Sequence, residues 1–230
     1  MNFLQLCQMV ARESGTISGL LPTAVVGQDG RLLKVVSWTQ SAWTKIQNDR
    51  RSWRWMYGEF NDTTTVTSAG TARYTATSWN LNRLANWVVD AESMSIYDAA
   101  IGVSDENLII PMSWDMYRRQ FVRGAQTPGR PQYYAISPAN EICFGPVPDR
   151  EYSIRGEYYK NPQTLVEATD VPELPARFHE VIGWYGLLLL AEHDEGQYHT
   201  QVAYRRYSEL MGDIRRDQLP RIAIGADALA

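Results

Sequence analysis

The histidines are the first residues of the chain that could do chemistry, because two of the three fall in one acidic segment. The segment AEHDEGQYH contains, within seven residues, His193, Asp194, Glu195 and His199. A zinc site needs at least three such side chains converging on one point. No HExxH spacing occurs, and Gly196 is expected to break the helix between the two histidines. We therefore interpret the segment as a solvated turn between two helices, and His179 as a surface or boundary residue.

Carboxylates near the ends of expected strands are the second candidates: Asp90, Asp98, Asp105 and Glu106. Two such groups could hydrolyse a glycosidic bond. Acidic residues are common at strand ends, however, so their spacing alone is weak evidence for catalysis. The chain has no P-loop, no dinucleotide fingerprint and no G-x-S-x-G elbow. The loop RGAQTPGRP, with Arg123 and Arg130, could touch a phosphate backbone, but we interpret it as a solvated loop. The sequence thus assigns no catalytic, cofactor-binding or metal-binding residue.

The net charge, the cysteines and the lengths of the apolar runs bear on the class and the location of the protein. The 230 residues carry a net charge of −4, which argues against a general nucleic-acid binder with a basic face. Cys7 and Cys143 sit in apolar surroundings and are expected to be ordinary buried thiols. No signal peptide is visible, and the longest apolar run, 187–191, is too short to span a membrane. We expect a protein made in a cytoplasm, with no membrane partner.

The elements that would position these residues follow the order helices, sheet, helices. Apolar spacing predicts helices over 2–13 and 32–50, one beginning near Pro175, and another over 198–217. Asn2 and Gln5 form a capping-box pattern, and His179 falls near the start of the third of these helices. The residues between them are expected to form strands.

The expected strands begin with a β-hairpin over 60–80 that turns at 68–70, followed by strands at 87–97 and 107–111. Ser113 is expected to cap a short helix that ends at Gly124. Three further strands are expected over 130–162, with turns at Asn140 and at Pro148-Asp149. The fold class is therefore α+β: a helical bundle formed by N- and C-terminal helices, with an inserted, mainly antiparallel β domain.

This interpretation divides the chain into four segments. Residues 1–59 hold the N-terminal helices of the bundle, and residues 60–162 hold the inserted β domain with its short helix near 113–123. Residues 163–219 hold the C-terminal helices, and residues 220–230 form an extended C-terminal tail. The alternating RIAIG of this tail suits a strand laid on a partner, although it could also fold back on its own chain. The residues proposed for partner binding are Leu219, Arg221, Ile222, Ile224 and Leu229.

An aromatic cluster follows the second expected helix and allows two interpretations. Trp53, Trp55 and Tyr57 could fill the junction between bundle and sheet, or, together with Arg54, form a contact to a neighbouring subunit. Aromatic and arginine side chains are enriched at permanent interfaces, which keeps the second interpretation open.

Ordered stretches along nearly the whole chain resemble one family. They are NFLQLCQMVARESG, VVSWTQSAWTKIQNDRRSWRWM, MSWDMYRRQF, PQYYAISPANEICFGPVPDREYSIRGEYYKNPQTL, PELPARFHEVIGWY and RRDQLPRI. In this order they resemble the head-to-tail adaptors of short-tailed phages, also called tail tubular proteins. None of the stretches is a chemical motif, so the match lies in the ordered pattern.

The resemblance implies a structural virion protein rather than an enzyme, with no cofactor. Such adaptors form a ring beneath the portal protein that matches its twelvefold symmetry, so a dodecamer of identical subunits is expected. The resemblance also implies a bundle toward the portal, a β domain toward tail tube or nozzle proteins, a C-terminal tail that reaches the portal, and a channel that passes viral DNA without reading its sequence. The alternatives are a hydrolase, which would use the carboxylates or the His193–His199 turn, and a glycan-binding tail module that uses the tyrosine-rich strands.

Overall fold

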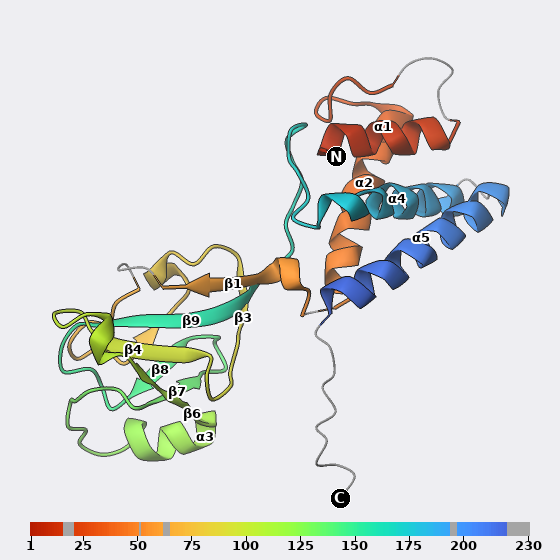
Figure 1. The fold of residues 1–230 in the computed structure, drawn as a ribbon. Helices are drawn as coiled ribbons and strands as arrows, with labels where there is room; N and C mark the ends of the chain where they lie inside the picture. The colour runs from red at the N-terminus through yellow and green to blue at the C-terminus, as the bar shows by residue number, and fades with distance from the viewer. Residues whose placement is uncertain (16–20, 51, 62–64, 194–196, 220–230) are drawn as a thin grey trace, which may run out of the picture. The chain divides into compact units, whose positions relative to one another are not determined.

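The computed structural model describes residues 1–15, 21–50, 52–61, 65–193 and 197–219, without the side chains of 197–199. Its helices and mostly antiparallel strands confirm the α+β class. The chain forms two compact units, one from Met1–Met56 with Pro162–Ala230 and the other from Tyr57–Asn161. We call them the helical unit and the β unit and describe each by itself (Figure 1).

Four long helices make up the helical unit: α1 (Phe3–Glu13), α2 (Gly30–Asn48), α4 (Glu180–His193) and α5 (Gln197–Gln218). Helix α4 contacts the other three, so it lies at the centre. Its sequence EVIGWYGLLLLAEH is apolar on nearly all sides, as a helix enclosed by others requires. Gly183 and Gly186 let α1 approach, because a Cβ added at Gly183 would lie 2.6 Å from the Met9 sulfur.

Hydrogen bonds to the first turn of α1 fix where this helix begins. The Asn2 side chain accepts from the Gln5 amide and the Gln5 side chain accepts from the Asn2 amide, which confirms the capping box. The amides of Phe3 and Leu4 donate to carbonyls of Asp170 and Ala168, so the loop before α4 satisfies the remaining N-terminal groups of α1. This loop therefore ties the N-terminal helix to the C-terminal half of its unit.

Two sheets make up the β unit. The first has the order β1 (Tyr57–Phe60), β9 (Tyr152–Lys160), β4 (Met94–Asp98) and β5 (Asn107–Leu108), with β3 (Leu84–Trp87) also paired to β9. The second has the order β2 (Arg73–Tyr74), β8 (Ile142–Gly145), β7 (Tyr133–Ile136) and β6 (Ile110–Pro111). Within the described residues all these pairs are antiparallel except β6 with β7.

Two strand expectations are corrected by this pairing, and a third is confirmed. The hairpin over 60–80 is wrong, because β1 pairs with β9 and β2 pairs with β8. The expected strand over 87–97 is two strands, β3 and β4, separated by a turn in which the Ser93 hydroxyl donates to the carbonyls of Val88 and Asp90. The three strands of 130–162 exist, but β8 and β9 belong to different sheets. The strands β1, β2 and β3 each pair with a strand that lies far away in sequence.

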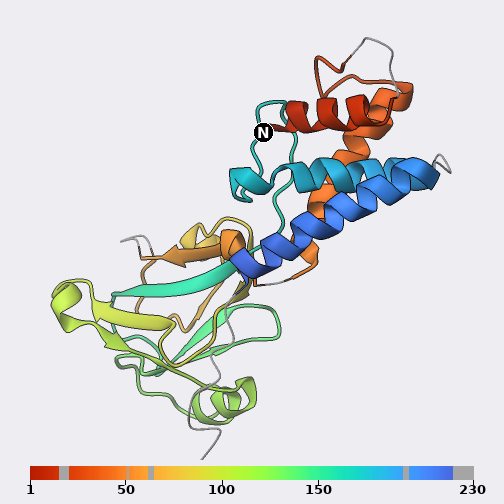
Figure 2. The same cartoon turned by 45° about the vertical axis from the view of Figure 1, so that its right-hand side comes forward.

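The two sheets enclose the core of the β unit. Inward side chains from both sheets form one cluster that includes Phe60, Trp87, Ile154, Tyr134 and Phe144. The other face of the second sheet is covered by α3 (Trp114–Tyr117), which continues as a π-helical turn, Arg118–Val122. The β unit thus has three layers: the first sheet, the second sheet, and α3. In Figures 1 and 2 alike, α3 lies on the far side of the second sheet from β1.

The sequence correctly predicts how α3 begins. The Ser113 hydroxyl accepts from the Met116 amide, which confirms the cap. Tyr117 is buried against the sheet and donates its hydroxyl proton to the Phe144 carbonyl at 3.1 Å. This anchoring fixes which side of α3 faces the sheet, and therefore which side chains of the following turn face outward.

Candidate functional site

Three of the four strand-end carboxylates, Asp98, Asp105 and Glu106, are held by arginines, whereas Asp90 forms no ion pair with a described basic residue. Asp98 lies 3.2 Å from the Arg150 guanidinium, and Glu106 lies 2.9 Å from that of Arg155. Asp105 pairs with Arg130 at 2.8 Å, and Arg130 also donates to the backbone carbonyls of Ile96 and Asp105. Arg130 is therefore a structural cross-link in the β unit, not a free phosphate contact, whereas Arg123 is exposed.

The pKa of Asp105 is shifted in the direction opposite to the shift that a general acid of a glycosidase requires. Hydrogen bonding from Arg130, with a further bond from the Asp98 amide, holds the pKa of Asp105 below its usual value. A general acid for glycoside cleavage needs a raised pKa instead. Asp98, Asp105 and Glu106 thus join the strand ends through ion pairs with arginines.

The expectation for His179 is wrong. Its imidazole is 2% exposed, with Nε2 donating to the Leu174 carbonyl at 2.7 Å and Nδ1 lying 2.6 Å from the Met1 amino group. Burial lowers the pKa of His179 below its usual value. The sequence pattern missed this because the carbonyl and amino partners come from a loop and from the far end of the chain.

His193 lies in the last turn of α4 and contacts α2. Its ring centroid is 5.2 Å from that of Trp38, and Nε2 is 3.2 Å from the Lys34 amino group. Residues 194–196 and the side chain of His199 lie outside the described residues. Among the residues that the structure describes, no group of three His, Cys, Asp or Glu side chains could hold a metal ion.

Both cysteines are buried and free, as expected. Burial raises the pKa of Cys7 to about 12 and that of Cys143 to about 11. A thiol nucleophile or metal ligand has to be deprotonated near neutral pH. Each cysteine therefore fills space in the core of its own unit.

The residues of the aromatic cluster belong to both units: Trp53 and Trp55 to the helical unit, and Tyr57 to the β unit. Trp53 is fully buried in the helical unit, where it stacks on Trp55 at 4.5 Å between ring centroids and donates Nε1–H to the Ile46 carbonyl. Arg54 is exposed, and Tyr57 begins β1 of the β unit. Trp53 packs inside its own chain, so Arg54, Trp55 and Tyr57 are the members that could reach another subunit.

The predicted tail residues lie almost entirely outside the described part of the chain. Leu219, half-buried just after α5, is described, whereas Arg221, Ile222, Ile224 and Leu229 are not. Among the described helices, none is both long and apolar enough to cross a membrane.

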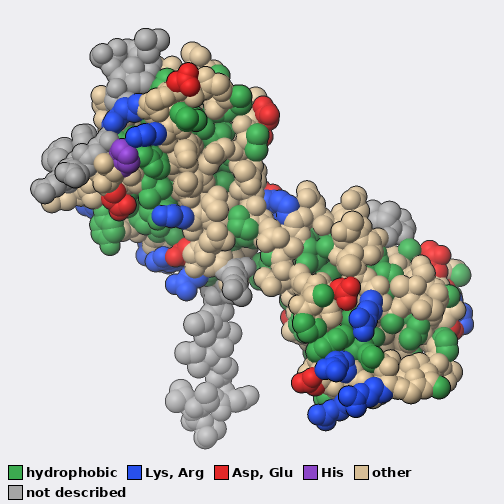
Figure 3. Space-filling view, turned by 180° about the vertical axis from the view of Figure 1, so that it is seen from behind, with side chains coloured by type: hydrophobic (Ala, Val, Ile, Leu, Met, Phe, Trp, Pro, Cys, Tyr) green, Lys and Arg blue, Asp and Glu red, His purple; other side chains and the backbone are tan. Residues whose placement is uncertain are grey.

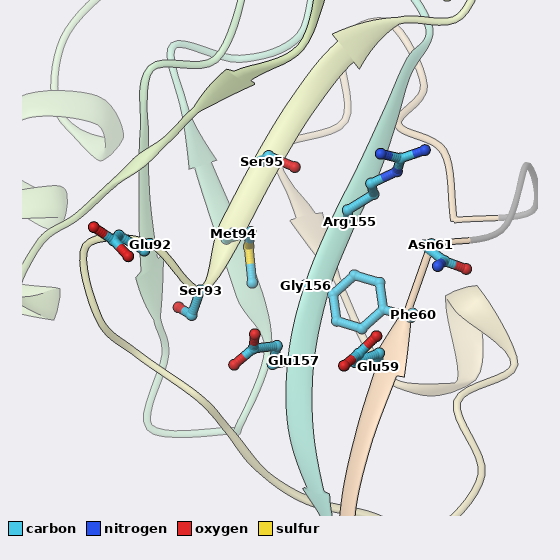
Figure 4. Close-up of a pocket in the computed structure, with 10 residues that line it drawn as sticks. All are labelled: Glu59, Phe60, Asn61, Glu92, Ser93, Met94, Ser95, Arg155, Gly156 and Glu157. Atoms are coloured by element: carbon cyan, nitrogen blue, oxygen red, sulfur yellow. The ribbon is translucent and has the colours of Figure 1, made fainter. Parts of the chain in front are cut away.

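An open hollow lined by several carboxylates lies on the outward side of the first sheet (Figure 4). Strand register places Glu59 opposite Glu157, and Arg155 opposite Ser95, on the outward side of this sheet. Glu92, from the turn before β4, lines the same hollow. Sequence reasoning missed this site, because Glu59 and Glu157 are 98 positions apart and only strand pairing brings them together.

Comparison with known proteins agrees with the resemblance seen in the sequence. A search of the curated proteins gives no match to this chain. The family model described as SU10 adaptor protein matches residues 1–226, which is nearly the entire sequence. The expected kinship with phage adaptors is confirmed by this match. The chain belongs to the SU10 adaptor protein family, a family of phage head-to-tail adaptors.

Proposed function

We propose that this structural adaptor forms a ring beneath the portal protein, joins capsid to tail, and forms part of the conduit for viral DNA. The family match over residues 1–226 carries the proposal. Membership implies contacts with portal and tail proteins and a place in the virion neck. In detail, the ring is a dodecamer that matches the portal and is assembled in the host cytoplasm. Tail nozzle or tail tube proteins join this ring from below.

Two surfaces are proposed for these contacts, and the net charge of the chain bears on the conduit. The C-terminal segment, with Leu219, Arg221, Ile222, Ile224 and Leu229, is proposed to bind the portal. Arg54, Trp55 and Tyr57, supported from behind by buried Trp53, are proposed to contact the neighbouring subunit. The net charge of −4 suits a channel through which DNA slides without being held by its phosphates.

The test is assembly with purified portal protein, followed by sedimentation and electron microscopy. We expect a stable complex in which a ring of this chain carries the rotational symmetry of the portal. A chain that stays monomeric in the presence of portal, and that does not co-sediment with it, would contradict the proposal. A glycan array and an assay of glycosidase activity, run on the same preparation, test the two alternatives directly.

A further inference from the structure

Three arginines on one helical segment have no partner within the described chain. Arg118, Arg119 and Arg123 follow α3, all are exposed, and none forms an ion pair or side-chain hydrogen bond with a described residue. Four other arginines of the β unit behave differently, since Arg73, Arg130, Arg150 and Arg155 each lie within ion-pair distance of a carboxylate. Figure 3 shows basic side chains gathered at the end of the β unit where α3 lies.

Apolar side chains are exposed on the same segment. Met116 is 56% exposed and Val122 is 46% exposed. The opposite side of the segment is fixed to the sheet by Tyr117 and Phe121, so this outward side is presented as a rigid surface. Arginine and methionine are enriched at protein–protein interfaces. We call this surface the arginine face: Met116, Arg118, Arg119, Val122 and Arg123.

A surface of opposite charge lies on the other outer layer of the same unit. Two adjoining hollows are lined by carboxylates that form no ion pair with a described basic residue; we call them the acidic face: Glu59, Asp90, Glu92 and Glu157. Arg155, which also lines the first of these hollows, is already engaged by Glu106 at 2.9 Å. Half-buried Tyr57 and Tyr159 pair edge-to-face on the same side of the sheet, at 6.0 Å between centroids.

The two faces match in chemistry as well as in charge. A guanidinium forms bidentate hydrogen bonds with a carboxylate and stacks on a tyrosine ring. A methionine sulfur packs favourably against aromatic edges. The arginine face supplies guanidinium and thioether groups, and the acidic face supplies carboxylates and two tyrosine rings.

The layer order decides how such faces can meet. The acidic face is on the outward side of the first sheet, and the arginine face is on α3, beyond the second sheet, so the two cannot meet within one β unit. Two different complementary patches on one subunit form a head-to-tail contact, and such contacts close into a ring when the rotation from one subunit to the next returns to the start. DNA would explain the arginine face but would leave the acidic face without a partner.

We propose that the arginine face of one copy docks on the acidic face of the next copy. This inference rests on the proposed ring and names the surfaces that join its β units.

Charge reversal with complementation tests the contact. The first variant, Arg118→Glu/Arg119→Glu/Arg123→Glu, makes both faces acidic, and the second, Glu59→Arg/Glu157→Arg, makes the sheet surface basic. Each variant alone should associate about tenfold more weakly than the natural chain, on portal or free, because like charges now meet. An equimolar mixture of the two should recover association. Arg12→Glu/Arg50→Glu/Arg216→Glu places the same charge change on the helical unit and should leave association unchanged.

Cysteine cross-linking locates the contact. A chain with Arg119→Cys and Glu157→Cys should form disulfide-linked ladders in the assembled state, whereas the two single variants should link only when mixed. The natural thiols do not interfere, because Cys7 and Cys143 are both 0% exposed. Circular dichroism of every variant confirms that its fold is kept.

The outcomes separate this inference from the proposed function. If folded charge variants assemble on portal as the natural chain does, the docking proposal is overturned and the adaptor role stands. If the triple arginine variant loses affinity for a short DNA duplex but assembles normally, the arginine face meets nucleic acid, and the docking proposal is again overturned. If the natural chain neither assembles nor binds portal, both proposals fail together.

Discussion

Glu59 on β1 and Glu157 on β9 lie directly opposite each other in the antiparallel register, and no described basic side chain pairs with either. Like charges placed this way destabilise a sheet by about 0.2–1 kcal/mol. They also contribute to raising the pKa of Tyr57 above its usual value, although burial of the phenol is the larger cause. The isolated chain therefore tolerates a repulsion that a basic partner would relieve.

Replacing Glu157 with Gln should stabilise the isolated chain, because it removes the repulsion with Glu59 and keeps the shape of the side chain. We expect the free energy of unfolding to rise by roughly 0.5 kcal/mol in low salt, with a smaller gain in high salt. Urea titrations at neutral pH measure this change. Glu167→Gln, an exposed control in the helical unit, should have no effect. A clear loss of stability in the Glu157 variant would show that this carboxylate makes a stabilising contact instead.

Gly156 on β9 should not accept a larger side chain. A Cβ there would lie 2.5 Å from Phe60 Cζ and 3.1 Å from Met94 Cε, inside the core between the two sheets. Gly156→Ala is expected to cost about 1–3 kcal/mol of unfolding free energy through overpacking. Gly129→Ala is the matched control, because no atom lies within 4 Å of its added Cβ. Equal thermal midpoints for the two variants would contradict this view of the core.

Buried His179 should make the helical unit sensitive to mild acid. Its pKa is lower in the folded chain than the ordinary value of 6.5, so the folded state favours the neutral ring. The stability contributed by the neutral ring is present above about pH 6.5 and is lost as the pH falls through the folded pKa. Urea unfolding at several values between about pH 7.5 and pH 5 measures this slope.

His179→Gln removes the titrating group and should flatten that slope. It should also lower stability near pH 7.5 by about 1–3 kcal/mol, because the bond to the Leu174 carbonyl is weakened inside a packed site. Gln201→Ala, at an exposed position of α5 that does not titrate, is the control and should keep the wild-type slope. An unchanged slope in the His179 variant would show that other groups govern the acid response.

Truncation after Leu219 tests the proposed portal-binding segment. The described helices end at Gln218, and the hydrophobic core that the structure describes is formed by residues before the cut. Folding should therefore survive, with a melting temperature close to that of the full chain, while binding to portal is lost. Early melting or aggregation of the truncated chain would mean that residues 220–230 belong to its own core.

Local chemistry was sufficient to predict several features of this protein from its sequence. The capping box of Asn2 and Gln5, the Ser113 cap and the helix–sheet–helix order all depend on groups a few residues apart. Short-range hydrogen bonds and apolar periodicity act within single elements, so they can be recognised without knowing the partner of each element. The resemblance to phage adaptors was likewise carried by ordered stretches of sequence, and the family match confirms it.

Only the tertiary structure decided which elements meet. Nothing local indicates that β8 and β9, neighbours in sequence, belong to different sheets, or that β1 pairs with a strand almost a hundred residues away. The burial of His179 and the facing of Glu59 with Glu157 depend on the same long-range choices. Strand pairing is settled by which apolar faces can be buried together across the whole unit, and no short window of sequence contains that information.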